Sequence, residues 1–328
     1  LILGVMQPQL IFSASTPAGG DLGAHVLGPA FLRDELLPSG SILGWSNSWF
    51  AGFPIFYFYF PLPSLVIVLL DVFIPYGAAF KMVTVMGLLA TPPAAYYLAR
   101  SIGMSRAVAT TAGAAGGSFV FIESFTIYGA NIASSLAGEF SFSWSFALSL
   151  VYFGLLIRGL RDDPSLLPVA ALVLGLTALS HIITTIVIVT ATLTMLVWRR
   201  AAGRVVFTWL AGFAVAGFWA LPLLARFGLT ADMAWSPLST WDELFPVEIW
   251  PIFALAIVGM VMAVRKTARA VPVVGLTLLP FIYYWLPVAF ADDPWKLWNG
   301  RLLPYWFFGL SFFAGIAVGM LAVGASRR

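Results

Sequence analysis

A carboxylate and an imidazole stand four residues apart near the start of the chain, in the segment GGDLGAH. On a helix, Asp21 and His25 would share one face. A carboxylate beside apolar segments is partly desolvated, which makes Asp21 a candidate general base or metal ligand. The alternative is structural, because Asp21 follows two glycines and precedes an apolar run, the setting of a helix N-cap. Spacing alone favours the cap.

The elements that must hold these groups are apolar segments of membrane-spanning length. A span of hydrocarbon takes about 20 apolar residues. Residues 1–14 are the end of a first membrane helix, and a long aromatic and glycine-rich segment, 15–63, follows it. Further apolar runs lie near 64–80, 81–100, 106–122, 138–158, 165–180, 181–198, 204–225, 249–264, 271–290 and 302–324. We therefore predict an all-α polytopic bundle of about 10–11 spans, a single transmembrane domain over 1–328 and a piece of a longer chain.

Basic clusters set the expected orientation, since Lys and Arg mark cytoplasmic loops. The clusters lie at 100–106, 158–161, 199–204, 265–269 and 327–328. They place the loops 123–137, 226–248 and 291–301 outside. The turn near residue 181 lies on the same side if 165–198 forms a hairpin. If 15–63 is also external, one helix within 64–100 must be re-entrant or interfacial. We expect two interfacial helices in this first extracytoplasmic loop, at 22–37 and roughly 47–58.

Composition excludes several classes of protein. Hydrophobic residues make up 61% of the 328 residues and charged residues 9%, whereas soluble domains are about a quarter charged. There is no cysteine and there are two histidines, which excludes thiolate sites and multi-histidine metal clusters. The net charge of +3 comes from short clusters between apolar runs, so the chain is not expected to bind nucleic acid.

Two motifs carry a resemblance to a known family. The first is Asp21 and His25 followed by Trp45, the triplet 52–54 (GFP), Pro61 and Pro63. The second is LWNGRLLPYW at 297–306. Their order resembles the GT-C superfamily of integral-membrane glycosyltransferases. More narrowly, it is similar to bacterial polytopic proteins labelled 6-pyruvoyl-tetrahydropterin-synthase-related.

The resemblance implies a cell-membrane enzyme with its active site on the extracytoplasmic face. A polyprenyl-phosphate sugar would be the donor and a cell-envelope glycan or lipid the acceptor, with membrane lipids around both. Asp21, His25 and Glu139 would be the catalytic residues. A divalent cation is the cofactor that such a site could hold, through Asp21 and Glu139. The alternative for Glu139, which opens an apolar run, is a carboxylate favoured by its helix dipole.

The second motif supplies the expected phosphate site. Arg301 stands where an external loop meets a span, and a guanidinium there could bind a prenyl phosphate bidentately. Lys296 would add charge and Trp298 would cover the isoprenoid. The alternative is an arginine that extends to the interface among aromatic neighbours.

Two other functions remain open. A transporter or lipid flippase would show paired interrupted helices and ionisable residues at mid-membrane, but most carboxylates here gather in the external loops. A non-catalytic scaffold would be insensitive to the loss of Asp21.

Overall fold

The computed structural model describes residues 1–123, 125–231, 235–289 and 297–326. These residues form an all-helical bundle, with one isolated antiparallel bridge, Ser46 to Phe53. The N-terminal part contains α1 (Ile2–Val5), α2 (Pro8–Ile11), α3 (Gly20–His25), α4 (Leu27–Phe31), η1 (Leu32–Leu36), η2 (Leu37–Ser39), α5 (Ile55–Phe58) and α6 (Pro61–Asp71). The bundle proper contains α7 (Tyr76–Ser101), α8 (Arg106–Ser118), η3 (Phe119–Phe121), α9 (Ile132–Ser134), η4 (Ser135–Glu139), α10 (Phe140–Arg161), η5 (Pro164–Leu166), α11 (Leu167–Ser180), α12 (Ile182–Ala191), η6 (Thr192–Val197) and α13 (Ala201–Ala225). It continues with η7 (Phe227–Leu229), α14 (Trp241–Leu244), η8 (Val247–Ile249), α15 (Trp250–Lys266), η9 (Ala268–Ala270), α16 (Val271–Ala289), η10 (Asn299–Leu302) and α17 (Leu303–Ala325).

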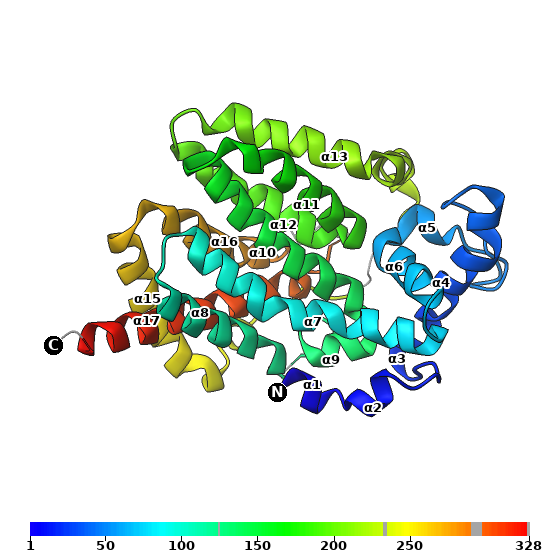
Figure 1. The fold of residues 1–328 in the computed structure, drawn as a ribbon, viewed down its shortest axis with the longest axis horizontal. Helices are drawn as coiled ribbons and strands as arrows, with labels where there is room; N and C mark the ends of the chain where they lie inside the picture. Colours follow the sequence, from blue (N-terminus) through cyan, green and yellow to red (C-terminus); the bar gives the residue numbers. More distant parts are fainter. Residues whose placement is uncertain (124, 232–234, 290–296, 327–328) are drawn as a thin grey trace.

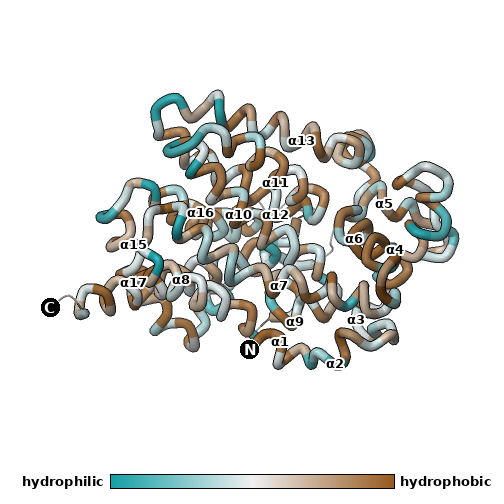
Figure 2. The backbone as a smooth tube through the Cα atoms, in the orientation of Figure 1, coloured by the Kyte–Doolittle hydropathy of each residue, from teal (hydrophilic) through white to brown (hydrophobic). Residues whose placement is uncertain are grey.

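The long helices are the membrane-spanning candidates. Five of the described helical segments are long and apolar enough to cross a bilayer: 76–101, 132–161, 201–225, 268–289 and 299–325. The other predicted runs form shorter helices, among them α6, α8, α11, α12 and α15. The 10–11 predicted runs are thus divided between helices of full span length and shorter ones. Figure 2 shows hydrophobic residues along most of these helices, as expected in lipid.

The segment 165–198 forms the predicted hairpin. On α11, Ala171 and Leu174 lie against Gly212 of α13. Two turns later, Ala178 packs in one cluster with Trp219. Residue numbers therefore increase in the same direction along α11 and α13, so α12 and η6 between them must run back.

Contacts between loops separate the bundle into two ends. At one end, which we call the basic end, Arg269 makes a bidentate ion pair with Asp162, at 2.6 and 2.8 Å. At the other end the Tyr128 hydroxyl donates to Glu243 at 2.7 Å, and the Trp298 indole donates to the Ser236 carbonyl at 3.1 Å. The charge pattern predicted one set of loops on each side. Loops of the same set contact one another in the structure, and the two sets lie at opposite ends of the bundle.

The first loop and its two predicted helices agree with the structure only in part. A nearly continuous helical segment runs from 20 to 39, which confirms the predicted helix 22–37. The helix predicted at 47–58 is wrong, since only Ile55–Phe58 is helical. Phe50, Ala51 and Gly52 adopt positive φ angles, and Ser46 and Phe53 exchange two backbone hydrogen bonds of 2.8 Å. A turn closed in this way cannot continue a helix.

The predicted run 64–80 is divided between two helices. α6 has 11 residues, a length of about 16 Å, which is too short for a hydrocarbon core of about 30 Å. Pro75 then precedes α7, which has 26 residues. The region 64–100 thus contains one helix of full span length, α7, and one helix, α6, that is too short to cross on its own. Figure 1 shows α3 to α6 together at the end of the long axis opposite the C-terminus.

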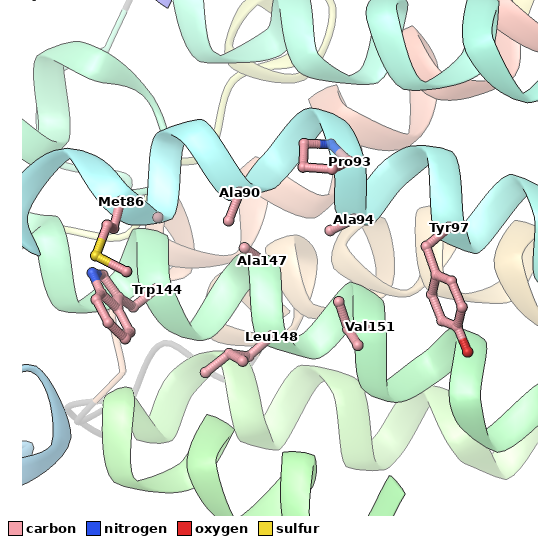
Figure 3. Close-up of a pocket in the computed structure, with 10 residues that line it drawn as sticks. Met86, Ala90, Pro93, Ala94, Tyr97, Trp144, Ala147, Leu148 and Val151 are labelled. Carbon is pink, nitrogen blue, oxygen red and sulfur yellow. The ribbon is translucent and has the colours of Figure 1, made fainter. Parts of the chain in front are cut away.

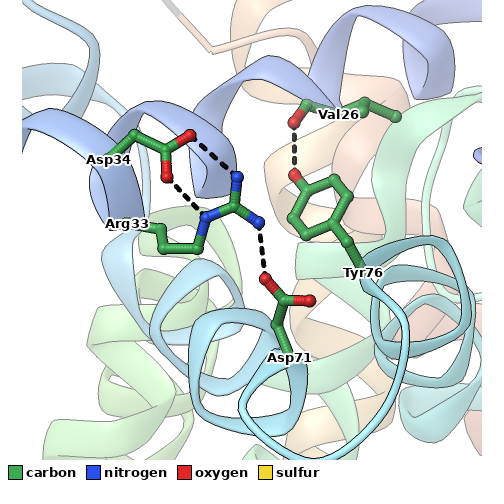
Figure 4. Close-up of polar contacts among 5 residues, drawn as sticks. All are labelled: Val26, Arg33, Asp34, Asp71 and Tyr76. Carbon is green, nitrogen blue, oxygen red and sulfur yellow. Dashed lines mark hydrogen bonds and ion pairs between the residues drawn. The ribbon is translucent and has the colours of Figure 1, made fainter.

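An ion-pair network links this loop to the bundle (Figure 4). Arg33 bonds to Asp71, at the end of α6, over 2.5 Å and to Asp34 over 2.6 Å. Its guanidinium lies 5.1 Å from the ring centroid of Tyr76, and the Tyr76 hydroxyl donates to the Val26 carbonyl. The network therefore connects η1 and the residue that follows α3 to the end of α6 and the start of α7.

Candidate functional site

The short helix α3 packs against η4, with glycine at the point of contact. Gly138 has φ +130°, and a Cβ built on it would lie 2.9 Å from Asp21 Cβ and 3.3 Å from His25 Cδ2. On the facing segment, a Cβ on Gly20 would lie 3.0 Å from the Ala137 carbonyl oxygen. Asp21 and His25 do share one face of a helix, and that face meets the residue before Glu139.

Replacing Gly138 should disturb this contact. Gly138→Ala introduces both an unfavourable φ, which costs about 1–3 kcal/mol, and a clash with Asp21. We expect a lower unfolding temperature in detergent and a displaced α3. Gly203→Ala is the matched control, because nothing lies within 4 Å of that Cβ and alanine favours a helix. Equal unfolding temperatures for the two variants would contradict the packing described here.

Asp21 is not a helix cap. The N-cap residue of α3 is Gly19, and no side chain makes a capping hydrogen bond there. Asp21 is the second residue of the helix and its side chain is exposed. The structural alternative suggested by spacing is therefore absent, and the carboxylate is open to a ligand.

Glu139 forms an ion pair with Arg301, 162 residues away in sequence. Glu139 stands at the N-cap position of α10 but makes no capping hydrogen bond. Its Oε1 accepts from Nη2 of Arg301. Sequence analysis assigned Glu139 and Arg301 to separate roles, but their side chains meet in one cluster.

Arg301 has spare donors. The residue is 9% exposed, and its Nε and Nη1 are buried without a hydrogen-bond partner among the described residues. A buried unpaired donor costs roughly 1–3 kcal/mol, and more when it is charged. An arginine at the membrane interface that only extends to water would not be buried in this way. The arrangement is that of a cation ready to receive an anion.

His25 is the group on which the charges of both carboxylates act. Its Nε2 lies 3.2 Å from the Tyr59 hydroxyl, and its ring meets Phe140 edge to face at 5.9 Å. Burial lowers the pKa of His25, while the charges of Glu139 and Asp21 act in the opposite direction. Burial also raises the pKa of Tyr59. At pH 7 the imidazole is therefore neutral and the phenol protonated.

Tyr59 is a residue of the cluster that sequence reasoning did not single out, and its neighbour Phe60 packs beside it. The Phe60 ring lies 4.2 Å from that of His181, whose Nδ1 accepts from the Ile183 backbone N–H at 3.3 Å, which caps α12. The only signal for them in the sequence is the aromatic run that ends in FPLP.

The other expected phosphate-binding residues lie differently. Trp298 is buried and packs edge to face on Tyr128 at 5.1 Å and against Trp235 at 5.2 Å. In the described part of the chain, the Trp298 side chain thus contacts these rings and the Ser236 carbonyl rather than the Arg301 side chain. Lys296 lies outside the described residues.

The cluster does not fit a metal ion. Nowhere in the described part of the chain do three or more His, Cys, Asp or Glu side chains come together in a way that could hold one. The Glu139 carboxylate is already bonded to a guanidinium, which would repel a divalent cation.

Comparison with solved structures identifies the fold. The chain superposes on ArnT from Cupriavidus metallidurans in the apo state with a TM-score of 0.61 and 13% sequence identity. The chain thus has the ArnT-like fold of a polytopic helical membrane protein. The match covers 99% of this chain and 62% of the ArnT chain. No family model matches the sequence, and no curated protein matches it.

Proposed function

We propose that the protein is a membrane glycosyltransferase. It transfers a sugar from a polyprenyl-phosphate donor to a glycan or lipid acceptor of the cell envelope, on the extracytoplasmic side. The observation that carries this proposal is the buried Arg301, which has two unpaired N–H donors and is paired with Glu139. The charge of Glu139, like that of Asp21, acts on His25. The ArnT-like fold supports it, as does the resemblance to 6-pyruvoyl-tetrahydropterin-synthase-related membrane proteins.

The proposed reaction divides the cluster between two roles. Asp21 takes the proton of the acceptor hydroxyl as its oxygen attacks the anomeric carbon of the sugar. The bond from that carbon to the phosphate oxygen breaks, and the phosphate leaves with the electron pair. Arg301 stabilises the charge that develops on the leaving phosphate. Attack opposite the leaving group inverts the configuration at carbon.

Glu139 and His25 complete the site without entering the bond changes. Glu139 holds the guanidinium in place, and leaves two of its nitrogens for the phosphate. A neutral His25 beside Asp21 keeps a second positive charge away from the base, so the carboxylate remains free to accept a proton.

The test is sugar transfer by purified protein in nanodiscs. Radiolabelled polyprenyl-phosphate sugars are supplied with a cell-envelope extract, and the label is followed into acceptor. We expect label in the glycan or lipid fraction and release of polyprenyl phosphate in equal amount. Movement of intact donor across the bilayer without cleavage would overturn the proposal in favour of a flippase.

A further inference from the structure

An apolar groove lies between α7 and α10 (Figure 3). Its volume is about 400 Å³. Met86 and Trp144 line one end and Tyr97 lines the other, with Ala90 and Ala147 between them. The distance from Met86 to Tyr97 along α7 is about 16 Å, close to half of a hydrocarbon core of about 30 Å. The groove therefore matches the depth of one leaflet.

Small residues and one aromatic ring form the part of the groove that lies closest to the basic end of the bundle. The Tyr97 ring lies against Gly154, where a Cβ would come within 2.8 Å of the ring. The Tyr97 hydroxyl is buried and has no hydrogen-bond partner among the described residues. An unpaired buried hydroxyl is unfavourable unless a ligand pairs with it.

A cation lies over the ring that carries this hydroxyl. The guanidinium of Arg158 is 5.9 Å from the Tyr97 ring centroid, and Arg158 is exposed. Tyr97 and Arg158 each lie about one turn inside a helix end, at Ser101 and Arg161. This is the depth at which a lipid's ester and headgroup oxygens would lie. The charge of Arg158 acts on Asp163, whose carboxylate already accepts from the Ser165 backbone N–H at 3.0 Å.

We propose that this groove is a specific site for an anionic phospholipid of the leaflet at the basic end. The acyl chain fills the groove, a lipid oxygen accepts from the Tyr97 hydroxyl, and the phosphate pairs with Arg158. Basic pockets between membrane helices are suited to acidic headgroups. The inference is independent of the proposed sugar transfer.

The first test is lipid binding by native mass spectrometry and by unfolding temperature in detergent. Phosphatidylglycerol and phosphatidylcholine are added separately to delipidated protein. We expect stronger retention and a larger stabilisation with phosphatidylglycerol. Arg158→Gln should lower the affinity for it about fivefold, the usual effect of one basic residue at a membrane surface. Arg265→Gln, an exposed arginine at the same end on α15, should leave it unchanged.

Two further arms examine the groove itself. Tyr97→Phe removes only the hydroxyl, so the protein alone should be as stable as before or more stable, while the stabilisation by phosphatidylglycerol should shrink. Ala90→Phe fills the groove at a lipid-facing position and should abolish selective retention. Glycerol 3-phosphate, a headgroup without chains, should have no effect.

The inference fails if the two phospholipids bind alike to wild type. It also fails if Arg158→Gln and Arg265→Gln weaken binding equally, or if Tyr97→Phe leaves the lipid-dependent stabilisation intact. Stabilisation by glycerol 3-phosphate equal to that by phosphatidylglycerol would show an anion site without a role for the groove.

Discussion

Turnover of the Asp21→Asn variant should fall by about 10² or more, the usual scale for loss of general-base assistance. Asparagine keeps the size of the side chain and removes its basicity. Because Asp21 makes no capping bond in α3 and is exposed, the unfolding temperature should not change. The measurement is initial rate of labelled-sugar transfer at saturating donor, with the unfolding temperature followed in parallel.

Glu35→Gln provides the matched control for this variant. Glu35 is an exposed carboxylate on the same loop, in η1, and lies outside the cluster. Its amide variant should turn over like wild type. If Asp21→Asn retains activity within a few-fold, Asp21 is not the base, and the assignment of the cluster as the transfer site loses its main support.

The second large effect is expected at Arg301. Loss of a charge-assisted hydrogen bond typically costs about 1.5–3 kcal/mol, so Arg301→Ala should raise the apparent donor KM by roughly tenfold or more. The same substitution leaves Glu139 without its partner, and breaking a buried pair is itself destabilising.

Two more variants separate binding from folding. The double variant Arg301→Gln with Glu139→Gln keeps the pair neutral and hydrogen-bonded, and should fold but still show the raised KM. Glu139→Gln alone keeps an amide oxygen that can accept from Nη2 of Arg301 and so hold the guanidinium in place, and its donor KM should stay near that of wild type. An unchanged KM in the folded double variant would show that Arg301 has only a structural role.

The helical framework was predictable because apolar length and basic clusters are local properties of a sequence. They were enough to locate most helices, the hairpin at 165–198 and the two ends of the bundle. The division at Pro75 was missed, because the residues on both sides are apolar and a hydropathy window averages over the break. The turn at 50–52 was missed because its positive φ angles depend on the pairing of Ser46 with Phe53.

Sequence analysis could propose residues for the candidate site but could not predict most of the contacts between them. The spacing of Asp21 and His25 gave their common face directly. The contact of Glu139 with Arg301 joins the start of α10 to η10, and no spacing rule reaches across 162 residues. The anchoring of Asp71 by Arg33 was missed for the same reason, since 38 residues separate them.

The central claim is that the donor phosphate binds at Arg301, and the most direct measurement is an experimental structure with polyprenyl phosphate bound. We predict density for the phosphate within hydrogen-bond distance of Nε or Nη1 of Arg301, with the phosphate oxygen that would carry the sugar turned toward Asp21. Phosphate density at the opposite end of the bundle, with the Arg301 donors still unpaired, would contradict the account.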